Sequence, residues 1–180
     1  MRLEELFESI PIESWNKKDL VGYEKYLDLF ENGKTVPYLD GEWNKGESTV
    51  RIYNANRSGI TSMKGAPKII NGSFAAGNNP LSSFEFAPEI VKGRVIISED
   101  KFKDLHNIHK HFKEIDGELY AENMDLDGPM LGLLKIKKLK RVIIDDMEIG
   151  DIINKYLPLG DVLECQQELI NAGYEAQAKL

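Results

Sequence analysis

The chain has 180 residues, of which 42% are apolar and 29% are charged, and this composition is typical of a soluble globular protein rather than a disordered one. Its formal net charge of −7 argues against a nucleic-acid-binding protein that works through bulk attraction to phosphate groups. Cys165 is the single cysteine, so the sequence predicts no intrachain disulfide and no cysteine metal site, and it favours a reducing cytoplasm.

Residues 1–48 predict a helical N-terminal cap and an atypical first turn. The stretches "RLEELFESIP" and "KKDLVGYEKYLDLFENG" carry apolar residues at helical spacing, and Pro11 and Gly33 end them. The stretch "TVPYLDGEWNKGESTVRIY" predicts a hairpin or an irregular turn, because Gly and Asn interrupt its aromatic and β-branched residues. Acidic residues near the start and the lack of an apolar run of about eighteen residues predict neither a signal peptide nor a membrane span.

Residues 49–160 contain a repeat with a period of 21 to 24 residues. Each repeat begins with an apolar strand residue, and a second apolar residue follows seven places later. The pairs are Phe74 and Leu81, Val95 and Phe102, Leu119 and Leu126, and Val142 and Ile149, after a looser first pair of Ile52 and Ile60. Because a solenoid stacks equivalent positions, the pattern predicts five turns with the first members in one buried column and the second members in another.

Each repeat also changes its local pattern along its length. The leading residues alternate as in a strand, and clusters such as "GNNP" and "SED" then indicate a turn before the chain returns. The sequence therefore predicts an α/β repeat solenoid, with a parallel sheet on one side, irregular or short helical returns on the other, and helical caps.

The repeat is similar to a known class. "NGSFAAGNNPLSSFEFAP", preceded by "ITSMKGAP", resembles the short repeats of the form Gly-x-Phe, Asn-x-Leu-Thr-Ser-Leu-x-Gly-Ala-Pro in small proteins of tailed bacteriophages and some bacteria. The period and the place of Asn79 before Leu81 match the leucine-rich-repeat class, although the equivalent positions elsewhere predict no continuous asparagine ladder. The resemblance covers about residues 49–150 and is closest over 58–93. It implies a solenoid fold and a phage origin, with no catalytic residues to transfer.

Residues 161–180 predict a C-terminal helical cap that covers the last turn, so that all three segments form one domain. Asp161 precedes the helix, and Glu164 is placed for a start that resembles a capping box. The apolar residues at helical spacing are Val162, Cys165, Leu169 and Ala172.

Two clusters of possible metal ligands are better explained without a metal. His106, His109 and His111 in "LHNIHKHF" lack a cysteine or a suitably spaced carboxylate, so solvated or packed histidines are favoured. "IIDDMEIGD" lacks the spacing of a calcium loop and predicts a hydrated acidic turn.

No catalytic residue is predicted, and neither is a metal or a cofactor. Ser82, Ser83 and Cys165 are nucleophile types without a local activating motif. The basic run "LLKIKKLKR" is short and lies in an acidic chain, so it predicts a solvated edge beside apolar residues rather than a nucleic-acid site.

The outward-facing strand positions are the candidate site. One column is predicted to hold Arg51, Ser73, Arg94, Glu118 and Arg141, and the next to hold Tyr53, Ala75, Ile96, Tyr120 and Ile143. Arginine beside tyrosine and isoleucine is typical of protein interfaces, although an N-terminal helix folded over this face would explain the same composition. The candidate protein-binding residues are Tyr53, Arg94, Ile96, Glu118, Tyr120, Arg141 and Ile143.

These observations predict a non-catalytic protein-interaction module whose partner is a protein, not a nucleic acid or a membrane. The resemblance and the small size extend this to a phage product that inhibits a host or defence protein by stoichiometric binding in the cytoplasm. A structural or virion-assembly protein that self-associates, and an enzyme whose site is not recognisable from sequence, are the alternatives. The partner and the oligomeric state stay open.

Overall fold

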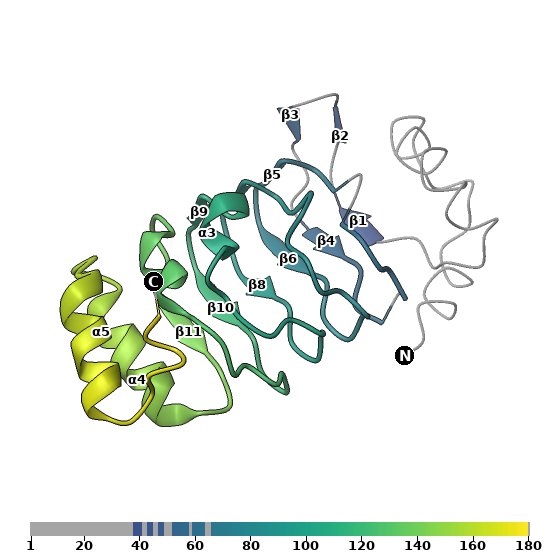
Figure 1. Cartoon of the computed structure of the whole chain (residues 1–180). Helices are drawn as coiled ribbons and strands as arrows, with labels where there is room; N and C mark the ends of the chain where they lie inside the picture. Colours follow the sequence, from purple (N-terminus) through teal and green to yellow (C-terminus); the bar gives the residue numbers. More distant parts are fainter. Residues whose placement is uncertain are drawn as a thin grey trace, which may run out of the picture.

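The chain winds into a parallel β-solenoid of about four turns (Figure 1). The structure is a computed structural model, and it describes residues 38–40, 43–44, 47–48, 52–57, 59–63 and 66–179. Both helices predicted in the N-terminal cap lie outside the described residues. The prediction of a repeat solenoid is confirmed, but the prediction of five turns is wrong by about one turn.

A mainly parallel long sheet and a parallel short sheet form two sides of the solenoid. The long sheet has the spatial order β1 (Tyr38–Asp40), β4 (Ile52–Asn54), β6 (Ser73–Ala75), β8 (Val95–Ile96), β10 (Glu118–Tyr120) and β11 (Arg141–Ile143). Strand β1 is antiparallel to β4, and the other neighbours are parallel. The short sheet consists of β5 (Ile69–Ile70), β7 (Ile90–Val91) and β9 (Glu114–Ile115).

The second sheet was not predicted, and it changes the fold class. The returns were expected to be irregular or helical, but β5, β7 and β9 pair there in parallel, and a bridge from Glu114 to Lys137 continues the ladder. Helices are few among the described residues, so the α/β and leucine-rich-repeat details do not fit this β-solenoid. Of the two alternatives predicted for this segment, a hairpin or an irregular turn, the structure has a hairpin, the antiparallel pair β2 (Trp43–Asn44) and β3 (Glu47–Ser48).

The inward residues of the long sheet stack in one column, as predicted. Phe74 pairs with Val95, Val95 with Leu119, and Leu119 with Val142, and all four side chains are buried. A parallel ladder repeats every 4.8 Å or so, which brings equivalent apolar side chains into direct contact. The column therefore forms the centre of the core.

The second predicted column holds only in part. Leu81 and Phe102 are buried, and the Lys101 amide donates to the Leu81 carbonyl across the turns at 2.8 Å. Leu126 is partly buried at the edge of the core, and Ile149 lies in a helix rather than in a return. The column is therefore regular only in the middle of the solenoid.

The corners before β6, β8 and β10 bring the backbones of successive turns close together. A Cβ atom on Gly117 would lie 2.6 Å from the Gly93 carbonyl oxygen, and one on Gly93 would lie 2.9 Å from the Gly72 carbonyl oxygen. Real Cβ atoms do not come this close to a backbone oxygen without a shift of the chain. Glycine at these positions is therefore a requirement of the stacking.

The corners after β4, β6, β8 and β10 turn through the left-handed region. One non-glycine residue with positive φ occurs there in each successive turn, namely Arg57, Asn78, Glu99 and Asn123. Such residues are uncommon because the left-handed region crowds the Cβ atom against the backbone. The repeated conformation shows that these turns share one path, which is what stacking requires.

Asn79 lies inside the solenoid, one residue past this corner, and holds two turns together. Its side chain is buried and accepts a hydrogen bond from the Ile60 amide at 3.2 Å. Its Nδ2 atom donates to the carbonyl oxygens of Ala55 at 2.8 Å, Ala76 at 2.6 Å and Gly77 at 3.1 Å. One buried amide thus serves three backbone carbonyls from two turns.

The C-terminal end is closed by two helices, α4 (Met147–Tyr156) and α5 (Val162–Asn171), which pack on each other and follow the last strand (Figure 1). Helix α5 was predicted, and the Asp161 side chain accepts a hydrogen bond from the Glu164 amide at its start. Helix α4 was not predicted. Asp146 accepts from the amides of Glu148 and Ile149 at its N-terminus, which is the usual role of a capping aspartate.

Shorter helical segments are α3 (Ile108–His111) and the 3₁₀ helix η2 (Leu131–Lys135). They contact each other, and η2 also contacts both C-terminal helices. Among the described residues, no helix is long and apolar enough to cross a membrane.

Asn154 of α4 caps the outer edge of the long sheet. Its Oδ1 atom accepts from the Val142 amide at 2.7 Å, and its Nδ2 atom donates to the Val142 carbonyl at 2.9 Å. The side chain therefore replaces the neighbouring strand that β11 lacks. An unpaired strand edge is a template for pairing with another chain, and this contact removes it at Val142.

Replacing Leu119 by Ala should lower the free energy of unfolding by about 2 to 5 kcal/mol, because the side chain is fully buried between Val95 and Val142. Urea unfolding followed by circular dichroism measures this change. Leu163→Ala is the matched control, since Leu163 is 69% exposed and its truncation should change stability by less than about 0.5 kcal/mol. Equal effects of the two substitutions would contradict the stacked core.

Replacing Asn154 by Ala should destabilise the protein by about 1 to 3 kcal/mol, because both backbone groups of Val142 lose their partner. Asn154→Asp keeps the acceptor but loses the donor, so it should also weaken the cap. Amide hydrogen exchange at Val142 reports the loss directly. The exposed Asp151 on the same helix provides the control Asp151→Ala, and unchanged exchange at Val142 in Asn154→Ala would rule out the capping role.

Candidate functional site

Six of the predicted site residues lie together on the outer side of three neighbouring strands. In the order β8, β10, β11, the register pairs Ile96 with Tyr120 and Tyr120 with Ile143. Alternation along each strand places the residue two positions earlier on the same side. We call this set the outer patch, and its members are Arg94, Ile96, Glu118, Tyr120, Arg141 and Ile143.

Polar contacts fix the centre of the outer patch. The Tyr120 hydroxyl donates to a Glu118 carboxylate oxygen at 2.8 Å, and the Arg94 Nε atom lies 3.5 Å from the same oxygen. The Arg94 guanidinium carbon lies 5.9 Å from the centroid of the Tyr120 ring, within the range of a cation–π contact. These contacts hold the tyrosine ring in place before any partner binds.

The outer patch is accessible but not fully solvated. The side chain of Arg94 is 62% exposed and that of Glu118 is 31% exposed, while Ile96, Tyr120 and Ile143 are of intermediate exposure. The hydrogen bond to Glu118, together with desolvation, raises the pKa of Tyr120 above its ordinary value, so the hydroxyl stays protonated and remains a donor at neutral pH. Arg141 is exposed at the edge of the patch.

The outward orientation predicted for Tyr53 is wrong. Tyr53 is only 2% exposed, and its ring stacks on that of Phe74 with centroids 5.1 Å apart. The strands pair Tyr53, not Ile52, with Phe74, so the first repeat was read one residue out of register. A one-residue shift reverses every side chain of a strand. The equal steps from Tyr53 to Phe74 and from Phe74 to Val95 were the signal that would have corrected the register.

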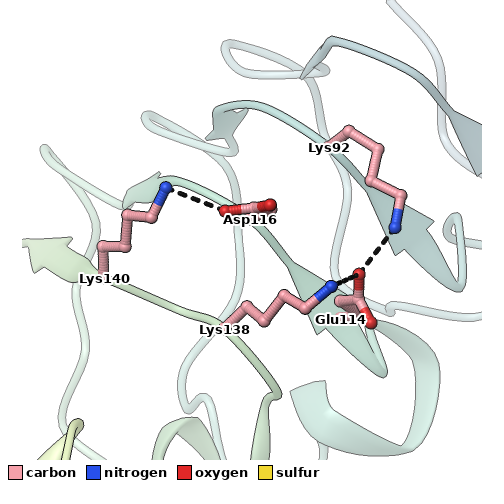
Figure 2. A network of polar contacts seen from close by, with 5 residues as sticks. All are labelled: Lys92, Glu114, Asp116, Lys138 and Lys140. Atoms are coloured by element: carbon pink, nitrogen blue, oxygen red, sulfur yellow. Dashed lines mark hydrogen bonds and ion pairs between the residues drawn. The ribbon is translucent and has the colours of Figure 1, made fainter.

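The short sheet carries a different kind of surface, a ladder of lysines and carboxylates. Figure 2 shows Glu114 between Lys92 at 2.7 Å and Lys138 at 2.9 Å, and Asp116 beside Lys140 at 2.8 Å. Positions in adjacent turns thus alternate in sign, which avoids stacking like charges.

The same alternation occurs in a second row of the short sheet. Glu89 lies 2.5 Å from Lys113 in the next turn and 3.8 Å from Lys68 in the preceding one. All five Lys–carboxylate contacts of the short sheet are partly or largely exposed to solvent. Exposed ion pairs of this kind each contribute little to stability. The face is therefore a solvated surface of paired charges, without the aromatic content of the outer patch.

The histidine cluster has packing roles. The Nδ1 atom of His109 lies 3.0 Å from the His106 carbonyl oxygen. Burial lowers the pKa of His109, and the positive charges of Lys135 and Lys110 lower it further. The His106 Nδ1 atom is buried and has no hydrogen-bond partner among the described residues. Within the described part of the chain, no three His, Cys, Asp or Glu side chains are grouped so that they could hold a metal ion.

The other chemistry-bearing residues also have structural surroundings. Asp146 caps α4, and an Asp145 carboxylate oxygen accepts from the Met124 amide at 3.3 Å. Burial raises the pKa of the Cys165 thiol to about 11, so that it is protonated and a poor nucleophile at neutral pH. The Ser83 hydroxyl oxygen accepts from the Glu85 amide at 3.1 Å at an exposed turn.

The basic run from Leu133 to Arg141 fits the prediction of a solvated edge beside apolar residues. Leu134, Ile136 and Leu139 are buried, while Lys138 and Lys140 point to carboxylates of the preceding turn (Figure 2).

Comparison with known proteins finds no matching family model, no similar curated protein and no similar solved structure. The function must therefore be argued from the geometry of this chain.

Replacing Glu114 by Gln should reduce the loss of stability at acid pH. Lys92 and Lys138 lower the pKa of Glu114 from its usual 4.5 to about 2, so its stabilising effect is present above pH 4.5 and is lost as pH falls through about 2. The urea midpoint of the wild type should therefore fall more steeply between pH 5 and pH 2 than that of the variant. Glu85→Gln, at an exposed position, is the control and should leave the pH dependence of the urea midpoint unchanged. The same pH dependence in all three proteins would contradict the stabilisation of ionised Glu114 by Lys92 and Lys138.

Proposed function

We propose that this chain is a non-catalytic protein-interaction module that binds a protein partner through the outer patch. The observation that carries the proposal is the set of contacts around Tyr120, which orient an aromatic ring between two isoleucines and beside two arginines on a rigid sheet. Tyrosine and arginine are enriched among residues that dominate binding energy. A preorganised ring also loses little conformational entropy when a partner covers it.

The contrast between the two sheets supports the choice of this face. The short sheet is covered by lysines that are already paired with carboxylates, and separating or burying such pairs requires their desolvation. The outer patch instead offers Ile96, Tyr120 and Ile143 as an apolar centre with charged residues along one side. An apolar centre with a polar rim is the usual anatomy of a protein interface.

The biological setting is a further part of the proposal. The repeat in residues 58–93 resembles those of small phage and bacterial proteins, so we place this module in a phage, acting in the host cytoplasm as a stoichiometric inhibitor of a host or defence protein. This part rests on the resemblance and on the size of the chain alone. Capture with the tagged chain from its native cell identifies the partner.

Self-association is the second candidate, and a specific observation favours it. The C-terminal helical end exposes four large apolar side chains, Met147 at 78%, Leu159 at 68%, Leu163 at 69% and Ile170 at 40%. The Asn154 cap argues against growth through the edge of β11, so self-association would use these side chains or the outer patch. A sedimentation series over protein concentration separates a monomeric binding module from an assembling protein.

Tyr120→Ala should weaken binding of the captured partner by about 2 kcal/mol, or roughly thirtyfold in Kd, while leaving thermal stability nearly unchanged. Calorimetric titration and thermal unfolding of the same variant measure the two quantities. Lys113→Ala on the short sheet is the matched control and should retain full affinity. Loss of affinity in the control but not in Tyr120→Ala would place the interface on the other face and refute the proposal.

A further inference from the structure

Asp100 occupies the place of Asn79 in the following turn of the solenoid. The two residues are 21 positions apart, and the Asn79 amide donates to the Asp100 Oδ1 atom at 2.7 Å. Asp100 is only 6% exposed, although an aspartate is rarely buried unless it is paired. Its Oδ2 atom is buried and has no hydrogen-bond partner among the described residues.

The repeat indicates which groups the Oδ2 atom is expected to face. In the preceding turn, the Asn79 Nδ2 atom occupies the corresponding place and donates to the carbonyls of Ala55 and Ala76. The spacing of 21 residues that relates Asn79 to Asp100 also relates Ala55 to Ala76 and Ala76 to Ile97. By this equivalence, the Oδ2 atom is expected to face the carbonyl oxygens of Ala76 and Ile97, which can only accept, so a donor is required there. An ionised carboxylate has only acceptors, whereas a protonated carboxyl group supplies one O–H donor.

We propose that Asp100 is a buried proton-binding site, at which a protonated carboxyl group takes the place of the asparagine amide, and that loss of this proton as pH rises through the neutral range loosens the solenoid. The site lies directly after the corner that follows β8, so it supports the turn that carries Arg94 and Ile96.

The charges around the site favour the neutral form. The preceding turn contributes the uncharged Asn79, and the following turn places Met124 at the equivalent position. Glu99 is the charged group that acts on Asp100 among the described residues, and its negative charge opposes ionisation. Desolvation, partly offset by the Asn79 hydrogen bond, raises the pKa of Asp100 from 3.8 to about 7.

The direction of the pH dependence follows from this shift. The pKa is higher in the folded protein than in the unfolded chain, so the stabilising effect is complete below about pH 4 and is lost as pH rises through about 7. This is opposite to the behaviour of Glu114, so the two sites act in separate pH ranges.

The test compares the pH dependence of urea unfolding for the wild type and Asp100→Asn between pH 5 and pH 8. Relative to the variant, the folding equilibrium constant of the wild type should fall on the order of a hundredfold over this range. The variant supplies a permanent Nδ2 donor, as Asn79 does, and should be the more stable protein at pH 8. Glu85→Gln should follow the wild type. Parallel curves for the wild type and Asp100→Asn would overturn the proposal.

A second measurement needs only the wild type and so does not depend on folding of the variant. The carboxyl carbons of ¹³C-aspartate-labelled protein are followed by NMR from pH 3 to pH 9. One aspartate should titrate near pH 7, and its signal should be missing in Asp100→Asn if that variant folds. Titration of all the aspartates below pH 5 would show that Asp100 is ionised at neutral pH and would refute the proton site.

Discussion

The spacing between successive turns, about 4.8 Å along a parallel backbone ladder, is the constraint on which the rest of this structure depends. At that distance every residue must fit against its own equivalent in the turns on either side. Glycine is needed at the corners of Gly93 and Gly117, where a Cβ atom would meet the preceding carbonyl group. Phe74, Val95 and Leu119 satisfy the same requirement by stacking apolar surface on apolar surface.

The constraint also explains why the two sheets present different surfaces. Stacked positions that carry charge must alternate in sign, and the short sheet does so with Glu89 between Lys68 and Lys113. On the long sheet, the outward column instead stacks the largely apolar side chains of Ile96, Tyr120 and Ile143. Contact with solvent alone would favour polar residues at these positions. Inside the solenoid, Asn79 and Asp100 stack as polar side chains. Such a column needs a donor opposite each acceptor, just as a column of charges needs opposite signs in adjacent turns.

Much of the solenoid was predictable because its period leaves a mark in the sequence, and the failures have physical reasons. Tyr53 was assigned outward because the looser step from Ile52 hid the register of the first repeat. Helix α4 was missed because Ile149 satisfies both the repeat spacing and a helical spacing with Ile152, Ile153 and Tyr156. The strands of the short sheet have two residues each, which is too short for alternation to show. The positions of the outer patch on β8, β10 and β11 followed from the period, but the contacts of Glu118 with Tyr120 and Arg94 depend on side-chain conformations that no pattern encodes.

The central claim is that β8, β10 and β11 stack in one register, so that their outer side chains form one continuous face. Nitroxide spin labels on cysteines replacing Arg94 and Arg141 test it most directly, because these positions are two strands apart, or about 10 Å, while the native Cys165 is buried and should stay unlabelled. The account predicts strong dipolar broadening in the electron paramagnetic resonance spectrum of the doubly labelled protein, compared with the sum of the two singly labelled spectra. A doubly labelled spectrum equal to that sum would contradict the stacked face.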